Sequence, residues 1–95
     1  MAKTITASQI FKIIESQNYI CALSGRKLTP ETASVDHIVP LSKKGTHDLS
    51  NIWIIDLRVN HAKGTMSVDE FVSMCKDVAR FQESKNIQNN NDNNK

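Results

Sequence analysis

The first run of apolar residues with helical period lies near the start of the chain. Ile10, Ile13 and Ile14 recur at the three- and four-residue spacing of one helix face. They follow Thr6-Ala-Ser-Gln9, a capping-box pattern in which the Thr and Gln side chains satisfy free backbone N–H groups. The pattern predicts a helix over 7–17 whose apolar face belongs to the core.

A second helical pattern lies near the end of the chain. Ser67-Val-Asp-Glu70 is another capping box, and Phe71, Met74, Cys75 and Val78 follow it at helical spacing, which predicts a helix over 68–83. Six of the ten residues in 86–95 are asparagine, a composition too polar to order itself by burial. We therefore predict one domain over 1–85 and a disordered Asn-rich tail over 86–95.

Two short stretches between the helices have the composition of strands. β-Branched residues become frequent in 33–39, a run that Pro40 ends, and 52–56 reads IWIID. A polar loop of about ten residues joins them, so an antiparallel pair is expected. Residues 21–32 contain Gly25 and Pro30 and predict a turn-rich connection. The fold class is therefore α+β.

Composition restricts the class of protein more than its function. A chain of 95 residues with 39% hydrophobic and 23% charged residues is typical of one globular domain. Its longest apolar stretch, 52–55, is too short to span a bilayer, so we expect a cytoplasmic protein without a membrane partner. The net charge of +2 does not by itself indicate a nucleic-acid partner. Cys21 and Cys75 form no metal-knuckle pattern and are expected to be buried thiols.

Candidate chemistry is concentrated in one stretch of the chain. Asp36-His37-Ile-Val-Pro40 is followed by Asn51 and then by Asn60-His-Ala-Lys-Gly64. A neutral imidazole can take a proton from water near neutral pH, and carboxylate and amide oxygens suit a hard ion such as Mg²⁺ or Mn²⁺. These groups are the ones that metal-assisted phosphodiester hydrolysis needs.

The run DHIVPLSKKGTHDLSNIWIID…VNHAKG resembles the HNH endonucleases, the ββα-metal nucleases of phages, of homing and restriction systems and of RNA-guided CRISPR effectors. The resemblance covers about residues 19–75, with DHIxP, LSN and NxxKG in the family's order. It implies a ββα-metal fold, a short antiparallel hairpin packed on a C-terminal helix, here with an added N-terminal helix. It also implies a phage or bacterial hydrolase, a divalent-metal-dependent DNA endonuclease.

The resemblance also implies a role for each matching residue. His37 would be the general base that activates water, Asp36 would bind the metal, and Asn51 would hold the loop and orient His37. Many members have a histidine metal ligand where this chain has Asn60, and His61 follows directly. We favour Asn60, because an amide oxygen is an acceptable Mg²⁺ ligand, and keep His61 as the alternative. Because adjacent strand residues point to opposite faces, Asp36 and His37 should lie at a strand end or a bulge.

Many relatives also carry two CxxC pairs that bind zinc. Here Cys21 and Ser24 stand for the first pair and Asp56 and Val59 for the second, so no structural zinc is expected. The implied cofactor is one divalent metal ion, Mg²⁺ or Mn²⁺.

Lysines near the motif are candidate contacts to DNA phosphates, namely Lys43, Lys44 and Lys63. His47 is expected to be a solvent-exposed loop residue and Trp53 a core residue. The main rival hypothesis is a non-catalytic nucleic-acid-binding HNH module. A subunit of a larger phage packaging or restriction assembly is a third. Because one metal site cuts one strand at a time, a homodimer is a further hypothesis, and nothing in the sequence indicates sequence specificity.

Overall fold

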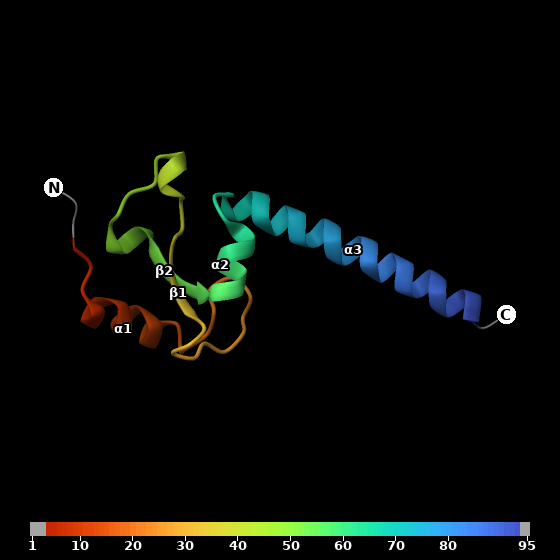
Figure 1. The fold of residues 1–95 in the computed structure, drawn as a ribbon, viewed down its shortest axis with the longest axis horizontal. Coiled ribbons are helices and arrows are strands. Elements are labelled where there is room, and N and C mark those ends of the chain that lie inside the picture. Colours follow the sequence, from red (N-terminus) through yellow and green to blue (C-terminus); the bar gives the residue numbers. More distant parts are fainter. Residues whose placement is uncertain (1–3, 94–95) are drawn as a thin grey trace.

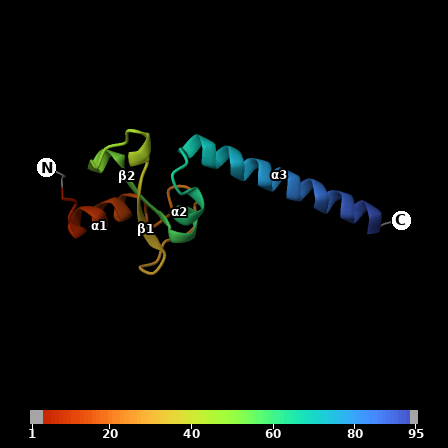
Figure 2. The ribbon, with the colours of Figure 1, turned by 45° about the horizontal axis from the view of Figure 1, so that its top comes forward.

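The computed structural model describes residues 4–93 of the chain, with the side chains of residues 4–86. A two-stranded sheet lies between short helices, and one long helix leaves this body at its end (Figures 1 and 2). The elements are α1 (Ala7–Ser16), β1 (Ala33–His37), the 3₁₀ turns η1 (Leu41–Lys43) and η2 (Leu49–Asn51), β2 (Ile52–Asp56), α2 (Leu57–Lys63) and α3 (Val68–Asn93). Among the described residues, no helix combines the length and the apolar character needed to cross a membrane. The predicted α+β class is confirmed.

The sheet is the antiparallel pair that the sequence predicts. β2 coincides with the predicted 52–56, whereas β1 ends at His37, two residues before the predicted end. The ladder stops there because the chain turns into the loop over 38–51. The N–H of Ile38 still bonds the carbonyl of Asn51 at 2.9 Å, but Val39 pairs with the Asn51 side chain instead of with a strand.

The core lies around β2. Consecutive residues of a strand face opposite sides of the sheet, yet Ile54 and Ile55 are 1% and 0% exposed, so both faces of β2 are covered. Cys21 and Leu28 complete this buried cluster, and the apolar face of α1 packs against it through Ile10, Ile13 and Ile14. α2 contacts both strands.

α1 is fastened to the sheet by the residue that ends it. The predicted capping box at its start is confirmed, because Thr6 and Gln9 exchange backbone-to-side-chain hydrogen bonds. Gln17 caps its other end. The Gln17 side chain then accepts the N–H of Ile54 at 2.9 Å and donates to the Ile54 carbonyl at 2.8 Å. One amide thus replaces a neighbouring strand at this point of β2.

The connection after α1 is closed around Cys21. Asn18 and Tyr19 adopt left-handed conformations, and Ile20 forms an isolated antiparallel bridge with Lys27. The Cys21 sulfur accepts the N–H groups of Ser24 at 3.3 Å and of Asp56 at 3.2 Å. Burial acts to raise the pKa of this thiol, but these hydrogen bonds outweigh it and leave the pKa below its ordinary value.

The helix that packs on the hairpin is α2, which the spacing of apolar residues does not predict. It has seven residues, too few for a helical pattern to be read. Local signals set its ends: the Asp56 carboxylate caps its start by accepting the N–H of Arg58 at 2.8 Å, and Gly64, with φ of 53°, ends it. α2 begins directly after β2 and contacts β1 as well as β2.

α3 begins at Val68 behind the predicted capping box, since Ser67 and Glu70 exchange hydrogen bonds. Only its first turn reaches the body, where Phe71 is 7% exposed. Further along, Val78 and Phe81 are exposed, and so is Cys75. The expectation that Cys75 is buried is therefore wrong, because the apolar face of α3 has no partner element beyond Phe71 within the described residues.

The backbone of α3 continues as helix to Asn93, over part of the segment for which the sequence predicts a disordered tail. A nucleated helix adds residues by propagation alone, and asparagine opposes helix only weakly, so the polar composition does not end α3. Residues 94–95 of the predicted tail lie outside the described residues. The domain boundary at residue 85 stays a prediction.

Candidate metal and phosphate site

Asp36 and His37 meet at the end of β1. They stand opposite Trp53 and Ile52 in a regular register, so their side chains leave opposite faces of the strand. Because His37 is the last residue of the strand, both still line one cavity of about 230 Å³. The remaining lining residues are Pro40, Leu41, Ser42, Lys63, Gly64 and Thr65. A strand end, and not a bulge, brings the two residues together.

Asp36 is held by two neighbours. Its Oδ2 accepts a hydrogen bond of 2.8 Å from Nε1 of Trp53 and lies 3.3 Å from Nζ of Lys63. The predicted core residue Trp53 thus has a second function, because it fixes one carboxylate oxygen. Within the described part of the chain, Oδ1 of Asp36 accepts no hydrogen bond and stays available for a ligand.

Lys63 is the least expected member of the site. The sequence suggests a surface contact to phosphate, but the side chain is 1% exposed and lines the cavity. Its ammonium group lies near Asp36 without hydrogen-bond alignment, and it has no hydrogen-bond partner among the described residues. A buried cation with unused donors at the wall of a cavity is placed to receive an anion.

His37 contacts a second histidine. Its Nε2 lies 2.9 Å from Nδ1 of His47, and the two ring centroids are 5.1 Å apart. His47 is exposed, as expected, but its hydrogen bond to His37 was not predicted. The two residues are ten positions apart across an irregular loop, and no spacing rule connects such positions.

Asn51 closes the loop over 38–51. Its Oδ1 accepts the N–H of Val39 at 2.9 Å, and its Nδ2 donates to the carbonyls of Val39 at 3.0 Å and Thr46 at 2.7 Å. The side chain therefore ties the start of the loop, at Val39, to its end. It makes no hydrogen bond to His37, so any effect on the His37 ring passes through the loop backbone.

The two candidates for the last metal ligand lie on different sides of α2. Nδ2 of Asn60 donates to Oγ of Ser34 at 2.7 Å and to the carbonyl of Val35 at 3.3 Å, so this side chain faces β1. Ser34 and Asp36 share one face of that strand. His61 is exposed and belongs to another side of α2. Asn60 thus contacts β1 and His61 does not, and neither side chain lines the cavity of Asp36 and His37.

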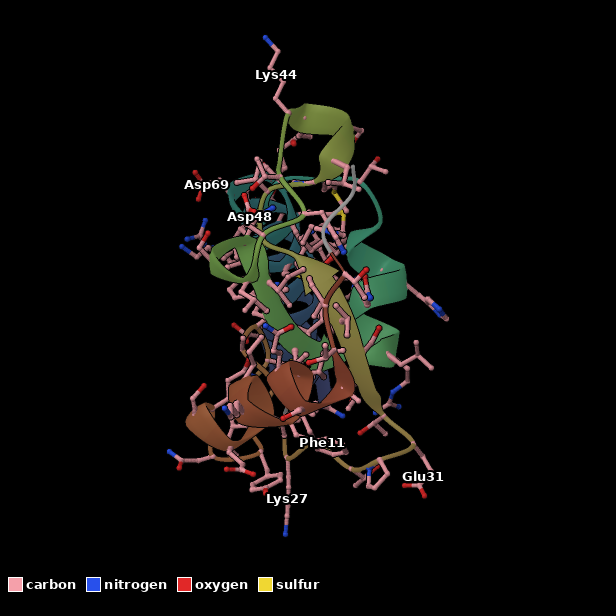
Figure 3. All side chains as sticks on the ribbon, turned by 90° about the vertical axis from the view of Figure 1, so that its left-hand side faces the viewer. Phe11, Lys27, Glu31, Lys44, Asp48 and Asp69 are labelled. Atoms are coloured by element: carbon pink, nitrogen blue, oxygen red, sulfur yellow. The ribbon has the colours of Figure 1, made fainter. Side chains whose placement is uncertain are left out.

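The loop lysines lie outside the cavity. Nζ of Lys43 forms an ion pair of 3.2 Å with Glu70 and so ties η1 to the first turn of α3. The N–H of Ser67 and this ion pair lower the pKa of Glu70 to about 2. Lys44 stands at an exposed turn and extends away from the body (Figure 3). Of the two, Lys44 is the one that solvent surrounds.

The donor set suits a hard ion that the protein holds by few ligands. One carboxylate, from Asp36, and one amide oxygen, from Asn60, match the way Mg²⁺ binds, through one or two protein oxygens with water and substrate phosphate. Among the described residues, no three His, Cys, Asp or Glu side chains gather into a metal-binding group. The residues therefore fit a weakly held Mg²⁺ or Mn²⁺ ion and no protein-only cage.

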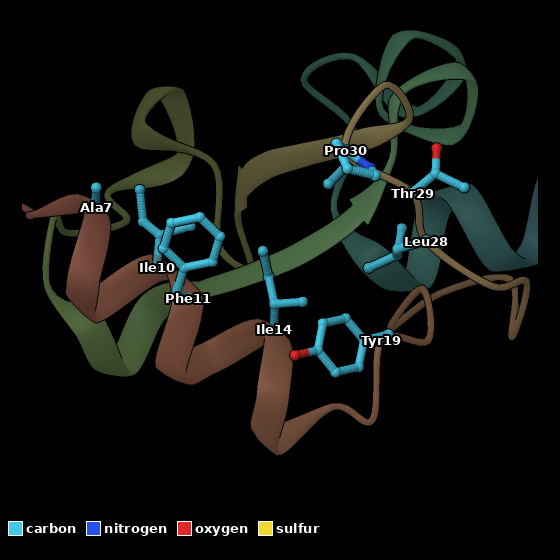
Figure 4. A pocket seen from close by; sticks show the side chains of 9 residues that line it. Ala7, Ile10, Phe11, Ile14, Tyr19, Leu28, Thr29 and Pro30 are labelled. Atoms are coloured by element: carbon cyan, nitrogen blue, oxygen red, sulfur yellow. The ribbon is translucent and has the colours of Figure 1, made fainter.

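A larger cavity of about 380 Å³ lies elsewhere, between α1 and the segment before β1 (Figure 4). Its lining is almost wholly apolar: Ala7, Ile10, Phe11, Ile14, Tyr19, Leu28, Thr29, Pro30 and Ala33. None of these side chains is a base or a carboxylate. Of these two cavities, only the smaller one is lined by a histidine, a carboxylate and a lysine.

Comparison with known proteins found a match over the middle of the chain. A protein-family model described as HNH endonuclease matches residues 20–66. The matched segment runs from before β1 to just beyond α2 and contains every residue of the site described above. A search among curated proteins found no match.

Proposed function

We propose, from the premise that the chain belongs to the HNH endonuclease family, that it is a divalent-metal-dependent DNA endonuclease. The observation that carries the proposal is the cavity of about 230 Å³ lined by Asp36, His37 and Lys63. A proton acceptor, a carboxylate and a buried cation in one cavity are the groups that hydrolysis of a phosphodiester requires.

The imidazole of His37 takes a proton from water, and the water oxygen forms a bond to phosphorus. The bond from phosphorus to the 3′ oxygen breaks, and a proton from solvent completes the 3′-hydroxyl. The products are a 5′-phosphate and a 3′-hydroxyl. When bound, the metal ion supplies positive charge that stabilises the leaving oxygen.

Three side chains, two in the cavity and Asn60 beside β1, prepare the site for the substrate. Asp36 and Asn60 are the metal ligands, with Oδ1 of Asp36 free for this purpose because Trp53 and Lys63 occupy Oδ2. The unused N–H donors of Lys63 donate to a non-bridging phosphate oxygen, where charge grows as water attacks. Lys44 contacts the DNA backbone outside the cavity, a contact that positions DNA without reading its sequence.

The rival function is a module that binds nucleic acid without cutting it. Burial favours catalysis, because binding alone has no need for a carboxylate and an ammonium group that are 8% and 1% exposed. A larger nuclease or packaging assembly and a homodimer remain hypotheses about partners. Sedimentation of the purified chain, alone and with DNA, tests the dimer.

The decisive experiment is conversion of supercoiled plasmid to nicked or linear DNA by the full chain with Mg²⁺ or Mn²⁺. EDTA and His37→Ala are expected to abolish cutting. Glu31→Gln serves as the control, because Glu31 is exposed and lies at the opposite end of the body from Lys44 (Figure 3). Cutting should be unchanged in this variant.

Ligand assignments are tested by calorimetry with Mn²⁺. Asp36→Ala and Asn60→Ala should weaken binding, whereas His61→Ala should not. Folded protein that retards DNA in gels but never cuts it with either metal would replace the endonuclease by the binding module.

A further inference from the structure

We propose that His47 is a positioning residue that holds the general base His37 in its reactive form. The proposal rests on the proposed function, because it needs His37 to accept a proton. It starts from the hydrogen bond of 2.9 Å between Nε2 of His37 and Nδ1 of His47. No other described residue hydrogen-bonds the His37 ring.

Either ring can donate the hydrogen in this bond. Only one of the two arrangements leaves His37 with a nitrogen lone pair that can act as a base. If Nε2 of His37 donates to His47, the lone pair on Nδ1 of His37 is free to accept a proton from water. If Nδ1 of His47 donates instead, Nδ1 of the neutral His37 ring carries a hydrogen and Nε2 is already occupied. Catalysis therefore requires His47 to be the acceptor and His37 to be the Nε2–H tautomer.

The backbone around His47 is fixed strongly enough for this task. Asn51 donates to the carbonyl of Thr46, the residue before His47, at 2.7 Å. Gly45 lies so close to Val39 that a Cβ at this position would collide with the Val39 carbonyl oxygen. The N–H of Gly45 also bonds the carbonyl of Pro40 at 3.0 Å. Asn51 thus acts on His37 through the loop and through His47.

Three variants separate hydrogen bonding from packing. His47→Phe keeps a ring but removes the acceptor, and His47→Ala removes both. His47→Asn restores an acceptor, because Oδ1 of Asn stands as many bonds from the backbone as Nδ1 of His. Ser50→Ala, an exposed change in the same loop, is the matched control.

Activity should follow the acceptor and not the ring. We expect kcat for plasmid nicking to fall about 10- to 100-fold in His47→Phe and His47→Ala, the usual effect of losing a group that orients a reactive side chain. KM should change by less than about threefold, since His47 contacts no substrate. His47→Asn should recover most of kcat, and Ser50→Ala should match the parent chain.

Nitrogen NMR of the histidine side chains tests the same idea without DNA. At about pH 8.5, where ordinary imidazoles are neutral, His37 should show the Nε2–H tautomer in the parent chain and in His47→Asn. In His47→Phe it should become a mixture of tautomers. This readout stays informative even if the parent chain cuts no DNA, so failure of the endonuclease and failure of the positioning role are distinguishable.

Three results would overturn the proposal. A His37 ring with hydrogen on Nδ1 in the free protein would show that His47 is the donor. A rise in kcat in His47→Phe would show that His47 blocks the base. Equal kcat in the Phe and Asn variants would show that the ring packing, and not the acceptor, matters.

Discussion

Nζ of Lys63 lies 3.3 Å from Oδ2 of Asp36, and both side chains are buried. Two opposite charges therefore stand together under the cavity in which we place the reaction. Their mutual attraction offsets the loss of hydration that burial imposes on each. The same pair explains why one oxygen of Asp36 is structural while the other is left for a ligand.

This relationship predicts a recovery of stability in a double variant. Asp36→Asn should lower the free energy of unfolding by about 3 kcal/mol, because the Lys63 ammonium then stays buried without a counter-charge. Adding Lys63→Met to Asp36→Asn removes that charge and should restore most of the loss. Urea unfolding of the parent chain and the variants measures this, and a double variant no more stable than Asp36→Asn would contradict it.

A second prediction concerns the joint between α1 and the sheet. Gln17→Ala should reduce the free energy of unfolding by about 1–3 kcal/mol, because it leaves the buried N–H of Ile54 without its Gln17 acceptor, while the Ile54 carbonyl keeps the N–H of Ala22. Gln9→Ala is the matched control, since it removes an exposed capping hydrogen bond and should reduce stability by about 0.5–1 kcal/mol. Equal losses in urea unfolding would show that the Gln17 bonds are as weak as exposed ones.

The part of the fold that could be predicted is local in sequence. Both capping boxes, at Thr6 and at Ser67, predict the helix starts that the structure shows, because the cap and the first turn are adjacent in the chain. The IWIID run also predicts β2 to the residue. Each of these signals acts within a few positions and needs no knowledge of the tertiary structure.

The remaining features of the fold and the site have no local sequence signal. α2 is too short to have a period, and the length of α3 depends on propagation that composition does not limit. In the site, the order of Asp36, His37, Asn51 and Asn60 marks the correct segment. The burial of Lys63 and the contact of His47 with His37 arise only when α2 and the loop fold over the end of β1.

A third prediction uses two glycines as a pair. Gly45→Ala forces the loop away from Val39, whereas Gly25→Ala meets no neighbouring atom and only strains a left-handed residue. Both changes should reduce stability by a similar amount, about 1–2 kcal/mol. Only Gly45→Ala should also lower kcat for plasmid nicking, because it displaces His47 from His37. Equal activity in the two folded variants would show that the loop position does not govern the base.

The domain boundary gives a fourth prediction. Removing residues 86–95 should change the melting temperature by less than about 2 °C, since the side chain of Phe71 is the last of α3 to be buried among those described. Circular dichroism of the full and the truncated chain then measures whether the removed segment is helical. A helical signal per molecule that falls on truncation indicates that α3 extends in solution as in the structure, and an unchanged signal indicates the disordered tail.

The ion pair of Lys43 with Glu70 gives a prediction about pH. The pKa of Glu70 is lowered from 4.5 to about 2 in the folded chain, so between these values the unfolded chain binds more protons. The stabilisation from Glu70 is therefore complete above about pH 5 and is lost as the pH falls towards about 2.

Glu70→Gln keeps the capping geometry without the charge. The melting temperature of the parent chain should exceed that of Glu70→Gln at neutral pH, and the difference should disappear near pH 2. A difference that is independent of pH would mean that the charge of Glu70 adds no stability through Lys43 or the N–H of Ser67.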